Sequence, residues 1–173
     1  PYMRSQLAGR HLSGAIQPGD LMRGETVAEV VTSKHPAFAA GARVRGFGGW
    51  QEWAVLDGEA LAPVPDRIQP PSLALSALGM PGLTAWAGLC CQAVPAPGDV
   101  LLVAAATGAV GSVVGQLGRA RGCRVIGIAG SDEKCAYAVA ELGYAACINR
   151  RSEDVAARLD ALCPDGIDIY FDL

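Results

Sequence analysis

The sequence predicts an α/β fold in which a doubly wound parallel sheet follows an antiparallel β region. From Pro97 onward, continuous apolar runs alternate four times with segments of helical spacing, which is typical of parallel strands joined by crossover helices. Before residue 70, short β-branched runs are separated by glycines, and this pattern favours antiparallel strands or a small barrel.

The N-terminal elements are short. Strand signals occur in the segments 24–33, 41–49 and 50–57. The proline-rich segment 62–72 is expected to continue neither a ladder nor a helix, so we interpret it as a crossing between modules. The segment 72–93 has helical spacing that is interrupted at 79–82, which predicts two short helices with a kink.

The C-terminal elements alternate strictly. Strands are predicted over 98–106, 123–131, 145–149 and 166–173, and helices over 111–122, 132–143 and 152–163. Ser152 is the expected N-cap of the last helix. The predicted divisions are therefore part of a first domain over 1–70, connecting helices over 71–96, and the first half of a parallel α/β domain over 97–173.

The composition excludes several classes of function. The 173 residues are 51% hydrophobic and 18% charged, which allows a sizeable core. A net charge of -3 argues against binding to nucleic acid or to anionic lipid. No apolar run reaches the roughly 18 residues that a spanning helix needs. We expect a cytoplasmic protein with neither a nucleic acid nor a membrane as partner.

The six cysteines predict buried, reduced thiols and no metal site. No two of them form a C-x-x-C pair, and adjacent cysteines do not fit one tetrahedral ion well. In a cytoplasmic protein such thiols act as small apolar residues. The cysteines are Cys90, Cys91, Cys123, Cys135, Cys147 and Cys163.

Three glycines lie between the first buried strand and its helix. Gly108, Gly111 and Gly115 follow the spacing G-x-x-G-x-x-x-G, which differs from the usual G-x-G-x-x-G. At this place in a βαβ unit, a dinucleotide pyrophosphate lies on the helix N-terminus, where a side chain would hold it off. Gly115, one turn later, is expected to let the helix approach the strand closely. The alternative is a tight turn without a ligand.

The end of the second strand indicates which dinucleotide binds. The residues Ala129–Ser131 include no carboxylate of the kind that binds the ribose of NAD. Lys134 follows in the next turn, and Arg150 and Arg151 follow the third strand. Cations at this place suit a 2′-phosphate, so the sequence favours NADP. The acidic pair 132–133 is interpreted as serving the helix dipole, and the arginines could alternatively form a solvated loop.

Several motifs occur in order through essentially the whole chain: PYMR, SKHPAF, GGWQEWAV, LGMPGLTAW, AAATGAVGSVVGQLG, VIGIAGSDEKC, INR and CPDGIDIYFD. In this combination the sequence resembles the zinc-free branch of the medium-chain dehydrogenases/reductases, the group of prostaglandin reductases, leukotriene hydroxydehydrogenases and 2-alkenal (enone) reductases. The resemblance implies a GroES-like β domain followed by a Rossmann domain. It also implies NADPH-dependent reduction of a carbon–carbon double bond next to a carbonyl.

The resemblance implies roles for individual residues. Substrate would contact Tyr2, and the nicotinamide end of NADPH would contact Met80 and Thr84. The pyrophosphate would lie on the glycine-rich turn, at Gly108, Ala109, Val110 and Gly111. The 2′-phosphate would bind Gly130, Ser131, Lys134 and Arg150. Arg150 stands where the family usually has tyrosine, so the charge is suitable while the geometry differs. No catalytic acid is assigned, because the family's proton donor would lie beyond Leu173.

The resemblance also implies a homodimer and a longer complete protein. Arg23-Gly24-Glu25 stands where the zinc-containing branch has Gly-His-Glu, so no metal site is expected. The sequence contains no arrangement typical of a nucleophile and its base, which favours hydride transfer over hydrolysis. Two alternatives stay open, a quinone oxidoreductase and a non-catalytic NADP-binding protein of the same fold.

Overall fold

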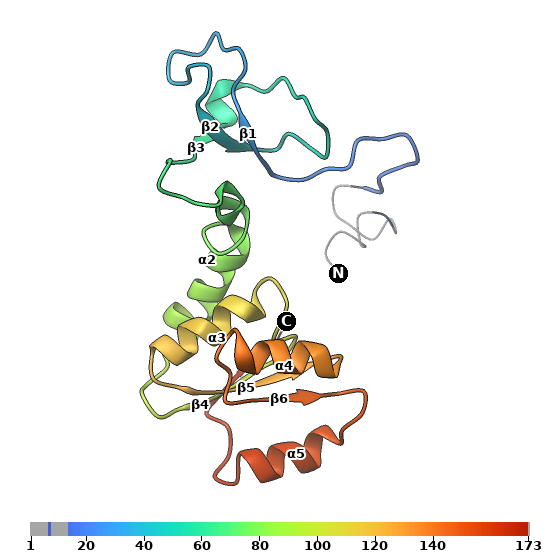
Figure 1. Ribbon diagram of the computed structural model, residues 1–173, viewed down its shortest axis with the longest axis vertical. Helices are drawn as coiled ribbons and strands as arrows, with labels where there is room; N and C mark the ends of the chain where they lie inside the picture. The colour runs from blue at the N-terminus through green and yellow to red at the C-terminus, as the bar shows by residue number, and fades with distance from the viewer. Residues whose placement is uncertain (1–6, 8–13, 173) are drawn as a thin grey trace. The chain divides into compact units, whose positions relative to one another are not determined.

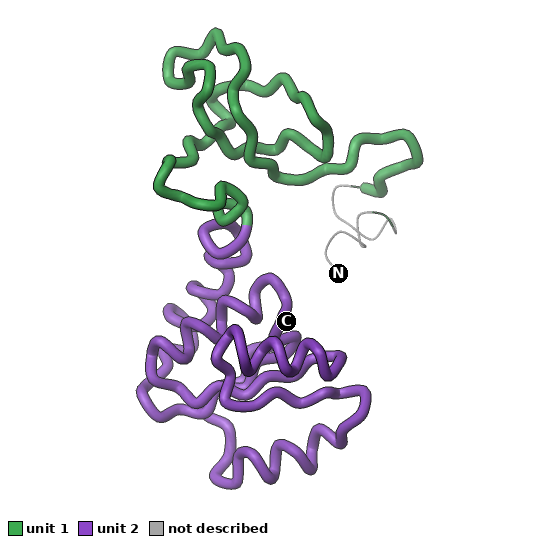
Figure 2. The backbone as a smooth tube through the Cα atoms, in the orientation of Figure 1, with its two compact units in different colours: residues 1–75 green, residues 76–173 purple. Residues whose placement is uncertain are grey.

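The computed structural model describes residue 7 and residues 14–172. The chain divides into two compact units, residues 1–75 and residues 76–173 (Figure 2). The boundary between Leu75 and Ser76 falls within the helical region that was expected to connect two domains. The finer division at residues 70 and 96 stays a prediction.

The first unit contains the expected antiparallel sheet. Its strands are β1 (Thr26–Glu29), β2 (Arg43–Gly46) and β3 (Ala62–Pro63), in the order β1-β2-β3 (Figure 1). Thr26 lies opposite Gly46, and Val44 lies opposite Pro63. Two 3₁₀ helices complete the unit: η1 (Gly58–Ala60) and η2 (Pro71–Leu75).

Two expectations for this unit are wrong. The proline-rich segment does continue the ladder at Ala62–Pro63, because β3 is an edge strand and an edge tolerates a residue without an N–H. The Val64 N–H then donates to the Arg43 carbonyl oxygen at 2.9 Å. The segment 50–57 forms no strand. Its large side chains are exposed, Trp53 at 73%, so no packing within the described residues favours extended pairing.

The second unit begins with a helical segment. Helix α2 (Met80–Trp86) passes directly into a π-helical stretch, η3 (Ala87–Ala93), which ends at Val94 with a φ of 50°. Gly79 is the N-cap of α2, and Pro81 lies in its first turn. The expected kink at this place is therefore the start of a helix, since proline is well tolerated in the first turn.

The parallel sheet of the second unit confirms the predicted fold class. Its strands are β4 (Val100–Val103), β5 (Arg124–Ala129), β6 (Ala146–Asn149) and β7 (Ile169–Phe171). They run parallel in the order β6-β5-β4-β7. The crossovers contain α3 (Gly111–Ala120), α4 (Asp132–Ala140) and α5 (Val155–Leu162). Along the chain, β5 and β6 are therefore added on one side of β4, and β7 is added on its other side.

The N-cap of α5 differs from the prediction. Asp154, and not Ser152, occupies this position, and its carboxylate accepts hydrogen bonds from the backbone N–H groups of Ala156 and Ala157 at 3.0 and 3.2 Å. The chain turns at residues 150–153 before the helix begins. Ser152 lies in this turn, where its own N–H donates to the Asn149 carbonyl oxygen.

The core lies on both faces of the parallel sheet. Alternate strand residues point to opposite faces: Leu101 and Val125 pack with α3 and α4, whereas Leu102 and Ile126 pack with α5. Figure 1 shows α4 and α5 on opposite sides of the sheet. Among the six free cysteines, only Cys123 and Cys163 are buried and Cys91 is exposed, so burial of all six thiols was a wrong expectation.

No helix in the described part of the chain has both the length and the apolar character that crossing a bilayer requires.

Candidate dinucleotide-binding site

The carboxyl ends of β4, β5 and β6 meet at one edge of the parallel sheet. The glycine-rich turn follows β4, Gly130 and Ser131 follow β5, and Arg150 and Arg151 follow β6. Because β7 pairs with β4 on the side away from β5, the chain reverses its direction of growth at β4. In open α/β sheets, ligands bind at such a switch point.

The glycine-rich turn wraps around the carbonyl group of Ala105. Ala105 has a φ of 46°, and its oxygen accepts a hydrogen bond of 2.7 Å from the Gly108 N–H. A Cβ atom on Gly111 would lie 2.5 Å from that oxygen, and one on Gly108 would lie 3.0 Å from it. Glycine is thus needed at position 111 because the turn folds tightly on itself.

The turn presents free backbone donors at the start of α3. No described residue accepts a hydrogen bond from the N–H groups of Ala109, Val110 or Gly111. The N-cap, Val110, provides no capping side chain, and the first turn contains no acidic residue. An uncapped helix N-terminus with unpaired N–H groups attracts an anion.

Gly115 lies against an aromatic ring. A Cβ atom there would collide with the Cε2, Cζ and hydroxyl atoms of Tyr144. The ring lies between α3 and β5, because a Cβ on Gly127 of β5 would also come within 2.9 Å of it. Gly115 therefore leaves space for the Tyr144 ring, and α3 packs closely against β5, as expected.

Tyr144 is the residue of this region that the sequence did not identify. Only 2% of it is exposed, and its hydroxyl donates to the Gly111 carbonyl oxygen at 2.8 Å. The Ala106 carbonyl oxygen lies 3.3 Å from the same hydroxyl. An aromatic residue after a helix-ending Gly143 indicates only a core position, because its partners are more than 30 residues away.

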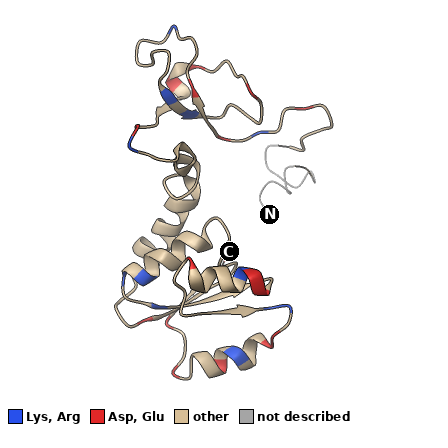
Figure 3. Ribbon diagram, in the orientation of Figure 1, with Lys and Arg blue, Asp and Glu red and all other residues tan. Residues whose placement is uncertain are grey.

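Two guanidinium groups lie beside the end of β5. The position of a Cβ on Gly130 is 3.7 Å from Nε of Arg151 and 3.9 Å from a terminal nitrogen of Arg150. Both arginines are exposed, and neither forms an ion pair among the residues that the structure describes. Figure 3 shows basic residues both in the loop after β6 and at the start of α4. This pair of cations is available to an anion.

The remaining residues at the end of β5 belong to the start of α4. Ser131 is its N-cap, and its Oγ accepts a hydrogen bond of 3.3 Å from the Lys134 N–H, which leaves the hydroxyl proton free to be donated. Lys134 is exposed. The Asp132 carboxylate is bound by the side-chain amide of Asn149 at 2.7 Å, so it has a partner within the fold.

Comparison with known proteins identifies the family. The model described as the N-terminal domain of oxidoreductase matches residues 1–64, and the one described as zinc-binding dehydrogenase matches residues 109–173. An NADPH-dependent curcumin reductase of Escherichia coli is 44% identical over 99% of this chain and 50% of its own. Prostaglandin reductase 1 of Mus musculus is also 44% identical, over 99% of this chain and 51% of its own.

A crystal structure agrees with these relatives. CurA of Vibrio vulnificus in complex with NADPH has a TM-score of 0.88 and 45% identity, covering 99% of this chain and 51% of its own. The chain belongs to the zinc-free medium-chain dehydrogenase/reductase group. It spans about half the length of the curated relatives it matches.

The other positions inferred from this dehydrogenase/reductase group lie in helix α2 or outside the described residues. Met80 is 63% exposed at the start of α2, and Thr84 is exposed one turn later, where its hydroxyl donates to the Met80 carbonyl oxygen at 2.8 Å. α2 packs against α3, so both residues share a unit with the glycine-rich turn. Tyr2, the expected substrate contact, lies outside the described residues.

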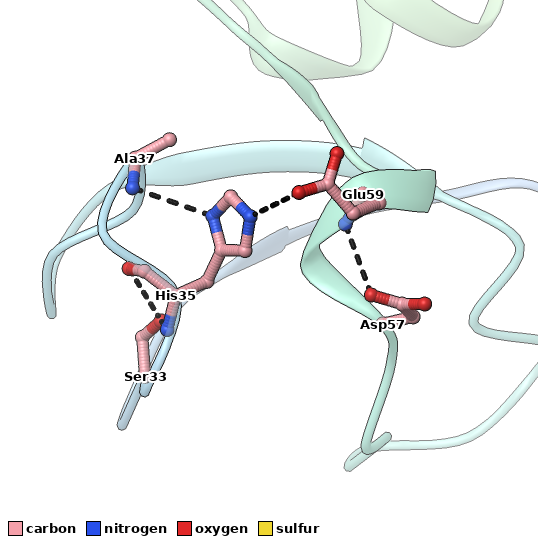
Figure 4. Close-up of polar contacts among 5 residues, drawn as sticks. All are labelled: Ser33, His35, Ala37, Asp57 and Glu59. Carbon is pink, nitrogen blue, oxygen red and sulfur yellow. Dashed lines mark hydrogen bonds and ion pairs between the residues drawn. The ribbon is translucent and has the colours of Figure 1, made fainter.

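His35, the histidine within the described residues, has a structural role. Figure 4 shows the His35 ring between two partners: Nδ1 accepts a hydrogen bond from the Ala37 N–H at 3.3 Å, and Nε2 contacts the Glu59 carboxylate at 3.0 Å. Since Nδ1 accepts, Nε2 carries the proton. The ring thereby joins the loop after β1 to η1. The described residues contain no cluster of three or more His, Cys, Asp or Glu side chains that could hold a metal.

Proposed function

We propose that the complete protein is an NADPH-dependent reductase of the carbon–carbon double bond of α,β-unsaturated carbonyl compounds. One observation carries the cofactor assignment. Three unpaired N–H groups, those of Ala109, Val110 and Gly111, share a sheet edge with the free guanidinium groups of Arg150 and Arg151. One set suits a pyrophosphate and the other a 2′-phosphate. The relatives named as curcumin, prostaglandin and 2-alkenal reductases support the activity.

The residues of the second unit would divide the binding of NADPH between them. The turn at 108–111 would donate its N–H groups to the pyrophosphate, while Gly130 leaves room at the end of β5. Ser131, Lys134, Arg150 and Arg151 would donate hydrogen bonds to the 2′-phosphate. Met80 and Thr84 would contact the nicotinamide end. The bound cofactor supplies the hydride.

The finer features of the whole protein are also proposals. Substrates would be small enals and enones, oxo-prostaglandins among them, with Tyr2 at the substrate pocket. We expect a cytoplasmic homodimer without a nucleic acid or membrane partner. The proton donor of the reaction is not assigned to any residue of this chain.

The test is a binding and turnover measurement on the full-length protein. NADPH and NADH are titrated in parallel, and each is then supplied with a medium-chain 2-alkenal, an aryl enone and a quinone. The proposal predicts tighter binding of NADPH than of NADH and oxidation of NADPH by the alkenal and the enone. Equal affinity for both cofactors would contradict the 2′-phosphate site.

Two outcomes would favour the alternatives. A quinone oxidoreductase of Pseudomonas syringae shares 32% identity and a TM-score of 0.62, covering 83% of this chain and 45% of its own. Faster turnover of the quinone than of both carbonyl acceptors would therefore assign the protein to that activity. Tight NADPH binding without turnover of any acceptor would leave a non-catalytic NADP-binding protein.

A further inference from the structure

The hydroxyl of Tyr144 contacts the turn that carries the free N–H groups. It is 2.8 Å from the carbonyl oxygen of Gly111 and 3.3 Å from that of Ala106. These two carbonyl groups bracket the segment 107–110. A single side chain from the loop before β6 therefore holds both ends of the turn that follows β4.

The surrounding glycines make room for this side chain. A Cβ on Gly115 would overlap the ring, and one on Gly127 would lie 2.9 Å from its Cδ1 atom. Two different elements, α3 and β5, thus lack a side chain where they face the ring. The aromatic ring is fixed from both sides, and this fixes the direction of its hydroxyl group.

The Tyr144 hydroxyl is suited to donate a hydrogen bond at all neutral pH values. Burial, together with the neighbouring Cys147 thiol, raises the pKa of Tyr144 above its ordinary value near 10. The hydroxyl therefore keeps its proton throughout the neutral range. A buried polar atom without a partner is costly, and within the described residues the hydroxyl donates to the two carbonyl oxygens of the turn.

We infer that Tyr144 is a positioning residue of the dinucleotide site, which holds the turn 107–110 in the shape that directs the N–H groups of Ala109, Val110 and Gly111 at a pyrophosphate. The inference rests on the proposed NADPH site and adds a residue to it. Tyr144 does not touch the cofactor. It acts through the carbonyl groups at positions 106 and 111, which belong to the first and last peptide planes of the turn. Holding these two planes fixes the ends of the segment that carries the free N–H groups.

A purely structural role predicts a different result. As a core residue alone, Tyr144 would support both halves of the site equally. If Tyr144 holds the turn in place, its loss weakens binding of the pyrophosphate and not binding of the 2′-phosphate, which Arg150 and Arg151 would contact after β6. The two ligands NADPH and adenosine 2′-monophosphate separate these cases, because only NADPH contains a pyrophosphate.

The experiment compares Tyr144→Phe with the wild-type full-length protein. The matched control is Tyr137→Phe, since Tyr137 lies on α4 with 51% exposure. Dissociation constants for NADPH and adenosine 2′-monophosphate are measured by calorimetry. We expect Tyr144→Phe to bind NADPH about 5- to 10-fold more weakly, the effect of one lost hydrogen bond. The affinity for adenosine 2′-monophosphate should stay within twofold, and the control should match the wild type for both.

Hydrogen exchange supplies a second readout that needs no ligand. In Tyr144→Phe, the amides of Gly108 and Ser112, which are hydrogen-bonded within the turn, should exchange faster than in the wild type, while those of β5 should not change. If the wild type binds NADPH, two results for Tyr144→Phe would overturn the inference. One is an equal loss of affinity for NADPH and adenosine 2′-monophosphate, and the other is an unchanged affinity for NADPH. A wild-type protein that does not bind NADPH would overturn the proposed function itself, and with it this inference.

Discussion

The side-chain amide of Asn149 donates a hydrogen bond of 2.7 Å to the carboxylate of Asp132. Asn149 ends β6 and is only 5% exposed, whereas Asp132 opens α4 at the end of the neighbouring strand. Asn149 also accepts a hydrogen bond from the Arg151 N–H at 3.1 Å, and its own N–H donates to Glu153. One buried residue thus holds a carboxylate in place and shapes the loop that carries the two guanidinium groups.

Replacing Asn149 should therefore destabilise the fold. Asn149→Ala removes the bond to Asp132 and the bond from Arg151, so we expect the free energy of unfolding to fall by about 1 to 3 kcal/mol. Urea denaturation measures this change. Asp132→Ala removes only one of the two bonds and should cost less. If the two variants were equally stable, the bond to Arg151 would contribute nothing.

The arginines should discriminate between the cofactors. Arg150→Ala and Arg151→Ala each remove a cation beside Gly130, so each should raise the dissociation constant of NADPH about 10-fold, as expected for a lost charge-assisted hydrogen bond. The affinity for NADH should not change. Arg121→Ala, at the end of α3, is the matched control. A loss of affinity for both cofactors alike would show that the arginines do not recognise the 2′-phosphate.

Position 115 should not accept a larger residue. Gly115→Ala places a methyl group where the Tyr144 ring lies, and overpacking of this kind costs about 1 to 3 kcal/mol. Thermal or urea unfolding measures the loss. Gln116→Ala, on the exposed side of the same helix, should change stability by no more than about 0.5 kcal/mol. A Gly115→Ala variant as stable as the wild type would contradict the close contact.

The two candidate caps of α5 can be separated by mutation. Asp154→Ala should lower the free energy of unfolding by about 1 kcal/mol, because two backbone N–H groups lose their acceptor. Ser152→Ala should change it by less than about 0.5 kcal/mol. Equilibrium denaturation of both variants gives the answer. A larger loss of stability for Ser152→Ala than for Asp154→Ala would indicate that Ser152 is the N-cap.

Stability should fall in alkaline solution in a way that depends on Tyr144. Burial raises the pKa of Tyr144 in the folded protein, so above pH 10 the unfolded chain loses this proton while the folded chain keeps it. The contribution is complete below pH 10 and decreases above it, by at most about 1.4 kcal/mol per pH unit. Tyr144→Phe should show a flatter decline above pH 10 than Tyr137→Phe. Identical curves would contradict the effect.

The sequence predicted the parallel sheet well because its signals are local and strong. The first three apolar runs are each followed by a helix of clear spacing, and the four strands of the second unit and the crossover helices α3, α4 and α5 lie where they were expected. The position of the glycine-rich turn followed from the same alternation. In the first unit, however, the edge strand at Ala62–Pro63 and the unpaired segment 50–57 depend on which neighbours are present. Local residue preferences do not contain that information.

The candidate site could be predicted as far as it is built from short segments that follow the predicted strands, and the loop with Arg150 and Arg151 is one of them. Gly108 to Gly111 form such a segment, and so do Gly130 to Lys134. The parts that were missed come from distant positions. Tyr144 supports a turn that precedes it by more than 30 residues, and Asn149 binds Asp132, which is 17 residues away. A buried tyrosine and a strand-ending asparagine are ordinary in sequence, and their roles follow only from what they face.

The contact between Tyr144 and Gly111 also has a consequence for the order of events during synthesis. Gly111 precedes Tyr144 by 33 residues, so the glycine-rich turn leaves the ribosome well before Tyr144 does. Until the loop before β6 has emerged and docked, the two carbonyl groups of the turn lack their donor. The nascent chain therefore completes the proposed anion-binding surface late, when β6 is added, although the glycines that define this surface are made before β5 and β6.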